Sequence, residues 1–82
     1  MATTTTEHTL AAAWGRRVAE ARRRAGLSQS GLADLCGVAQ QTVSKIERGR
    51  MVPLDKLKLR LAEELGTSPA VLFAWPSRTT DR

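Results

Sequence analysis

The feature that most constrains the fold of this chain is a window of twenty residues, Gln29 to Arg48, with small, glycine and apolar residues at fixed spacings. Ala33, the fifth residue of the window, is small enough for a second helix to cross close to the first. Gly37, the ninth, suits a tight turn, in which a positive φ is expected. Further residues can fill the wedge between the two helices: Leu32, Cys36, Val38, Val43 and Ile46. The window therefore predicts two short helices joined by a tight turn.

The ends of these two helices carry signals of different strength. Ser28 is a good N-cap for the first helix, whereas Gly31 stands where a glutamate would complete a capping box and costs that helix ~0.5–1 kcal/mol. The second helix is expected over about 40–48, and Gly49 ends it. Its N-cap position is Ala39, which has no side-chain acceptor. Because every spacing is met without an insertion and "IERG" follows, the window indicates a helix-turn-helix motif.

Three more helices are expected outside the window. Before it, an apolar stripe with steps of three and four residues ends at Gly26, which suits a left-handed helix end. After it, one helix opens at Pro53 and ends at Gly66, and a short one follows the cap Ser68. Leu59 falls off the stripe of the Pro53 helix and is either a second contact face or an exposed leucine. The stripe before the window consists of Leu10, Trp14, Val18, Ala21 and Ala25, and that of the Pro53 helix consists of Leu54, Leu57, Leu61 and Leu65. The short last helix holds Val71, Leu72 and Phe73. Within the window, Leu32, Ala33, Leu35 and Cys36 give the apolar face of the first helix.

The chain has 82 residues, which is enough for one small domain. Five expected helices without a strand signal predict an all-α fold. Residues 1–8 are rich in threonine and lack apolar periodicity, so we expect a flexible tail there. The helix-turn-helix domain is expected over 9–76, and a second flexible tail over 77–82.

Charge is concentrated in the middle of the chain. Residues 11–60 carry eleven basic and four acidic side chains, a local charge of +7, within a formal net charge of +5 for the whole chain. This distribution favours a polyanionic partner, nucleic acid before membrane. A single cysteine excludes an internal disulfide and fits the reducing cytoplasm. The sequence contains no apolar run of membrane-spanning length and its start lacks the features of a secretory signal, so no membrane partner is expected.

The side chains that enzymes and metal sites need are scarce. The chain has no tyrosine, its one histidine (His8) lies in the expected tail, and its one cysteine (Cys36) occupies a core position of the motif. No phosphate-binding loop is recognisable. We therefore expect neither an enzyme nor a bound cofactor or metal.

With these residues in place, the chain resembles the Cro/CI-type (XRE-like) helix-turn-helix domains of phage repressors, restriction-modification controller proteins and small bacterial regulators. The matching segments are "GRRVAEARRRAGLSQ", "LSQSGLADLCGV", "QQTVSKIERGR" and "LRLAEELGTSPAVLF", which span roughly 14–73. Gly31, Ala39 and Lys58 depart from the family pattern, the last standing where the family often has an aliphatic residue. The resemblance implies a five-helix, lambda-repressor-like DNA-binding domain.

The resemblance also implies which residues read DNA bases. In the family, the first residues of the second helix of the motif reach base edges in the major groove. A glutamine amide can give and take hydrogen bonds at adenine, a lysine can donate to guanine or to phosphate, and Ala39 could touch a thymine methyl. The implied base contacts are Ala39, Gln40, Gln41, Ser44 and Lys45. The alternative is that Gln40 and Gln41 are ordinary surface glutamines.

Phosphate contacts are implied on both sides of this helix. Gln29 resembles the family's phosphate contact at a helix N-terminus, and Arg48 and Arg50 flank the following loop. Arg22 and Glu47 match a family pair that is expected to form an ion pair and to aim Arg22 toward a phosphate. The alternative for Arg22 and the two arginines after it is a solvated helix face.

These inferences predict a sequence-specific regulator of transcription that binds double-stranded DNA, acting as a repressor and homodimer on a pseudo-palindromic operator in the cytoplasm of a bacterium or from a phage gene. The dimer interface is expected at the end of the Pro53 helix and in the helix after it, through Leu59, Val71, Leu72, Phe73 or Trp75. The alternative is an antitoxin-like or co-regulator module that binds a protein partner. The off-stripe Leu59 and the apolar "AVLFAW" segment are compatible with that alternative.

Overall fold

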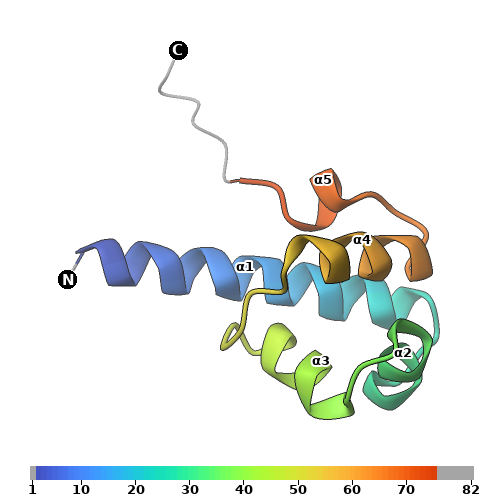
Figure 1. Ribbon diagram of the computed structural model, residues 1–82. Helices are drawn as coiled ribbons and strands as arrows, with labels where there is room; N and C mark the ends of the chain where they lie inside the picture. Colours follow the sequence, from blue (N-terminus) through green and yellow to red (C-terminus); the bar gives the residue numbers. More distant parts are fainter. Residues whose placement is uncertain (1, 76–82) are drawn as a thin grey trace.

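The structure is a computed structural model that describes residues 2–75, so Pro76 and the expected tail over 77–82 lie outside it. Residues 2–75 form five helices and no strand (Figure 1). The helices are α1 (Ala2–Arg24), α2 (Gln29–Cys36), α3 (Gln40–Glu47), α4 (Asp55–Glu64) and α5 (Pro69–Leu72). The predicted all-α fold of five helices is confirmed.

The first helix begins earlier than the sequence pattern indicated. α1 starts at Ala2, so the backbone of residues 2–8 is helical where a tail was expected. In Figure 1 the first turns of α1 extend beyond the other helices. An apolar stripe appears in a sequence only where a helix faces a core, so this segment carried no periodic signal. Its flexibility stays a prediction.

The core forms where the other helices meet the second half of α1. Val18 of α1, Leu32 of α2, Val43 of α3 and Leu61 of α4 are fully buried together. In Figure 1, α4 and α5 lie above α1, and α2 and α3 lie below it. α3 is therefore held on one side of the domain with its outward face open to solvent.

The turn between α2 and α3 has the predicted geometry. Gly37 adopts φ 72°, and Ser28 caps α2 by accepting a hydrogen bond from the backbone N–H of Gly31 at 2.9 Å. The N–H of Val38 donates to the carbonyl of Ala33 at 3.0 Å, which closes the helix end. This closure sets the angle at which α3 leaves α2.

Three residues that were expected to face the core are exposed. Ala25 lies after the last residue of α1, and Leu54 is the residue before α4, with 81% of its surface exposed. Leu35 is 42% exposed. These expectations were wrong because all three residues lie at or near the end of a helix. The apolar spacing continues there, but no neighbouring helix covers the side chains.

The segment after α5 returns to α1 around an aromatic cluster. Trp14 donates from Nε1 to the carbonyl of Ala74 at 2.8 Å and makes edge contacts with the rings of Phe73 and Trp75. The Nζ of Lys58 lies 4.8 Å from the centre of the Trp14 ring. A cation over an aromatic face is attracted by the ring quadrupole, which explains how a lysine fits where the family often has an aliphatic residue.

Candidate nucleic-acid interface

The outward face of α3 collects the residues that were predicted to read bases. Val43 and Ile46 are buried on its inner face. On the opposite side Ser44 is half-buried, and the remaining side chains are exposed: Gln40, Gln41, Lys45 and Arg48. One surface hollow is lined by Gln40, Gln41, Ser44, Lys45 and Arg48, and Ala39 is exposed just before it.

The C-terminal end of α3 is packed tightly against α1 through two glycines. A Cβ at Gly15 would meet the carbonyl oxygens of Ile46 and Glu47, the latter at 2.6 Å. A Cβ at Gly49, which has φ 75°, would lie 2.8 Å from the Cα of Ala12. Side chains at either glycine would push α3 away, so this close approach positions the interface. Sequence reasoning placed Gly49 as a helix end and gave Gly15 no role.

A bidentate ion pair joins α1 to the last residue of α3. Arg22 Nε lies 2.6 Å from Glu47 Oε2, and Arg22 Nη2 donates to Glu47 Oε1 at 3.1 Å. The two side chains are 12% and 6% exposed. The hydrogen bonds that Glu47 accepts raise the pKa of Arg22 above its ordinary value. The ion pair expected from the sequence is therefore present in the structure.

The guanidinium of Arg22 uses three of its five N–H groups inside the domain. Its Nη1 donates to the carbonyl of Leu27 at 2.8 Å, and its Nε and Nη2 donate to Glu47. One N–H on Nη1 and one on Nη2 are left over. The structure therefore gives Arg22 a structural role, and its phosphate contact stays a prediction.

Gln29 links the two ends of α3. Its Nε2 donates to Glu47 Oε1 at 2.9 Å, and its Oε1 accepts from Gln40 Nε2 at 3.1 Å. Ala39 makes no side-chain cap hydrogen bond. The hydrogen bond from Gln40 to Gln29 therefore anchors the start of α3 to α2. No sequence signal indicated it, because the bond depends on how two helix starts meet in space.

The direction of these bonds is fixed by chemistry. A carboxylate only accepts hydrogen bonds, so Gln29 must turn its amide nitrogen toward Glu47. The carbonyl oxygen of Gln29 then faces Gln40, which must in turn present its nitrogen. Gln40 is left with its carbonyl oxygen and one N–H outside the hydrogen bonds found among the described residues.

Basic side chains surround this network. A second hollow, beside Glu47 and Gln29, is lined by Arg16, Arg23 and Arg48, together with one further acidic side chain, Glu20. Arg50 is exposed after α3. Arg16 and Arg23 are seven residues apart and so share one side of α1. Sequence reasoning singled out Arg22 instead, although this spacing could have identified Arg16 and Arg23.

The residues predicted for a dimer interface divide into two groups. Leu59, Val71 and Trp75 are 52%, 61% and 73% exposed. Leu72 and Phe73 are 2% and 7% exposed and belong to the core. The surface that these predicted residues offer to a partner therefore comes from Leu59, Val71 and Trp75, and the dimer interface itself stays a prediction.

Neither a membrane-spanning helix nor a metal-binding cluster is found among the described residues. No helix in that range combines the length and the apolar character needed to cross a bilayer. Among side chains in the described part of the chain, no three histidine, cysteine, aspartate or glutamate residues gather where they could hold a metal ion.

Comparison with known proteins places these observations in a wider group. The family model described as Helix-turn-helix matches residues 18–72. A protein of Methanothermobacter thermautotrophicus, described as an uncharacterized HTH-type transcriptional regulator, is 41% identical over 49 residues, which cover 60% of this chain and 71% of that protein.

Solved structures give the same picture. The restriction-modification controller protein C.AhdI from Aeromonas hydrophila matches with a TM-score of 0.73 and 36% identity, over 77% of this chain and 96% of that one. The clp gene regulator ClgR from Corynebacterium glutamicum matches with a TM-score of 0.73 and 28% identity, over 77% and 67%. A transcriptional regulator of the HTH_3 family from Vibrio cholerae matches with a TM-score of 0.73 and 26% identity, over 83% of this chain and 38% of that one.

Proposed function

Because the chain belongs to the helix-turn-helix family, we propose that it is a sequence-specific regulator of transcription that binds double-stranded DNA through α3. The resemblance inferred from the sequence is confirmed at the level of the family. The family and its regulator members point to a protein without enzymatic activity. The observation that carries the base-reading role is the exposed start of α3, where Gln40 is held by Gln29.

Base reading is proposed for the outward face of α3. The free carbonyl oxygen and free N–H of Gln40 match the N6 donor and N7 acceptor of adenine in the major groove. Guanine presents two acceptors there, so one of them would face the Gln40 oxygen. Gln41, Ser44 and Lys45 extend the same surface, and exposed Ala39 is proposed to touch a thymine methyl group.

Backbone contacts are proposed beside this surface. Gln29 uses one N–H on Glu47 and keeps a second for a phosphate, together with the backbone N–H groups at the start of α2. Arg48 and Arg50 lie after α3, and Arg16 and Arg23 approach from α1. Phosphate contacts of this kind make binding fall steeply with salt.

The mode of action we propose is repression of a promoter in the cytoplasm by a homodimer. Two copies related by a two-fold axis would bind half-sites about 34 Å apart in a pseudo-palindromic operator. A second candidate function is a protein-interaction module, and it is favoured by Val71 and Trp75, which leave apolar surface exposed near α5.

Selection from a random pool of double-stranded DNA, with the protein's mass in solution measured in parallel, tests this function. We expect a palindromic consensus with an adenine preference in each half-site. Recovery of random sequences with uniform, weak affinity would contradict sequence-specific regulation. It would favour the interaction module, for which Gln40→Ala and Gln41→Ala would have no effect on function.

A further inference from the structure

The solvent face of α4 carries an ordered stripe that the DNA interface does not use. Lys56, Leu59, Arg60 and Glu63 are spaced at i, i+3, i+4 and i+7, so they share one side of the helix. All four are exposed, and Leu59 is 52% exposed. Leu59 and Arg60 therefore lie at the centre of the stripe, with Lys56 toward one end and Glu63 toward the other.

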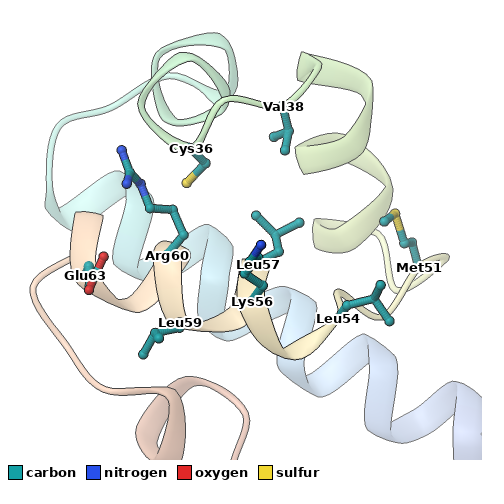
Figure 2. Close-up of a pocket in the computed structure, with 9 residues that line it drawn as sticks. All are labelled: Cys36, Val38, Met51, Leu54, Lys56, Leu57, Leu59, Arg60 and Glu63. Carbon is teal, nitrogen blue, oxygen red and sulfur yellow. The ribbon is translucent and has the colours of Figure 1, made fainter.

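An apolar groove runs beside this stripe (Figure 2). It has a volume of about 580 Å³, with Met51 and Leu54 at one end and Cys36 and Arg60 at the other. Leu57 lies between the two ends. The groove offers room for an apolar side chain that approaches α4 from outside the domain, and exposed Leu54 adds to its apolar rim.

The two end charges of the stripe are not used inside the domain. The ion pairs found among the described residues join Arg22 to Glu47 and Arg60 to Glu64. Lys56 and Glu63 are seven residues apart, about 10.5 Å along a helix axis, so they cannot neutralise each other. Each charge is available to a partner.

We propose that the α4 stripe packs antiparallel against the same stripe of a second copy of this chain. With the two-fold axis between positions 59 and 60, Lys56 of one copy faces Glu63 of the other, and the reverse pair forms as well. Leu59 and Arg60 of each copy lie next to the axis. Arg60 is paired with Glu64 at 3.3 Å and donates to the carbonyl of Leu35 at 2.9 Å, so its charge is compensated within its own domain and Leu59 supplies the apolar contact. An interface of this kind is self-complementary, as two-fold symmetry requires.

The charge pattern favours a second copy over a different partner. An acidic partner would be attracted to Lys56 and repelled by Glu63, and a basic partner would experience the opposite. Only a surface with opposite charges in reversed order satisfies both ends, and the antiparallel copy provides that order. The assignment rests on the homodimer in the proposed function and places its interface on α4.

Charge exchange tests the assignment. Lys56→Glu and Glu63→Lys should each put like charges at both ends of the interface, raising the dimer dissociation constant about tenfold or more at low salt. The double variant K56E/E63K should dimerise like the original chain. An equimolar mixture of the two single variants should form a heterodimer, because each supplies the charges that the other needs.

Sedimentation equilibrium without DNA gives the dissociation constants, and Asp34→Lys on α2 serves as a control because it is exposed and lies off the stripe. Circular dichroism spectra like that of the original chain would show that the variants are folded. Single variants that dimerise as tightly as the original chain, or a double variant that stays monomeric, would overturn the interface. A monomeric original chain at every concentration would overturn the homodimer as well, whereas specific binding to a duplex with one half-site would still support base reading by α3.

Discussion

The Nε2 of Gln40 donates a hydrogen bond to the Oε1 of Gln29 at 3.1 Å and so joins the first residues of α3 and α2. Because Gln29 is itself anchored on Glu47, the amide of Gln40 cannot rotate freely between its two orientations. An amide with a fixed orientation distinguishes a base-edge donor from an acceptor. A freely rotating amide can adapt to either.

Replacing Gln29 with methionine should therefore remove discrimination at one operator position. The side chain keeps a similar length but loses both hydrogen bonds, so Gln40 becomes free to turn its nitrogen toward guanine. We expect the preference for adenine over guanine at that position to shrink by about 1–3 kcal/mol. Competition binding with operators that differ at single positions measures this.

Gln41→Met is the matched control, since it removes a neighbouring amide that is not part of the network. It should change preference at a different position. Equal weakening of Gln29→Met on every sequence would mean that Gln29 contributes only to phosphate binding.

Glu47→Ala should destabilise the domain strongly. It leaves the guanidinium of Arg22, a side chain only 12% exposed, without its carboxylate partner. Loss of one member of a buried pair costs about 3–5 kcal/mol, and the partial exposure of Arg22 suggests the lower end of that range. Urea unfolding followed by circular dichroism measures the free energy of unfolding.

The double variant R22M/E47L tests the reason for that loss. It replaces both charges with apolar side chains and should recover much of the stability, because no buried charge is left unpaired. A double variant that is less stable than Glu47→Ala would show that the ion pair itself, rather than the stranded charge, dominates.

The sequence predicted the parts of the fold that depend on local geometry and burial. Gly37 and Ser28 act over a few bonds, so their turn and cap could be inferred without knowing the rest of the domain. Gln29 and Gln40 are eleven residues apart, and their bond exists only because α2 and α3 cross at one angle. Leu54 matches the spacing of the apolar stripe, but no neighbouring helix covers it and it is exposed. Spacing in the sequence does not show where a covering helix ends.

Gly15→Ala should destabilise the domain although alanine is the better helix former. The added Cβ would meet the backbone carbonyls of Ile46 and Glu47, which cannot move without shifting α3. We expect a net loss of about 1–3 kcal/mol, as for overpacked cores, and weaker DNA binding from the displaced helix. Thermal unfolding and operator binding are the measurements.

Gly31→Ala makes the same replacement on α2 and provides the comparison. The nearest atom to its new Cβ is the hydroxyl of Ser28 at 3.2 Å, the end of an exposed side chain. Its effect on stability should be much smaller. Similar losses at both glycines would rule out the close approach of α1 and α3 as the cause.

Arg23→Ala should reduce the salt dependence of DNA binding. Arg23 lines the hollow beside Glu47 and Arg48, whereas its neighbour Arg24 lines a different hollow, between α1 and the α4–α5 loop. Each phosphate contact releases about one counterion, so the slope of log K against log salt should fall by about 1 for Arg23→Ala. Arg24→Ala removes the same charge from the adjacent position and should leave the slope nearly unchanged. Equal slopes for the two variants would mean that binding responds to the net charge of the domain and that Arg23 contacts no phosphate.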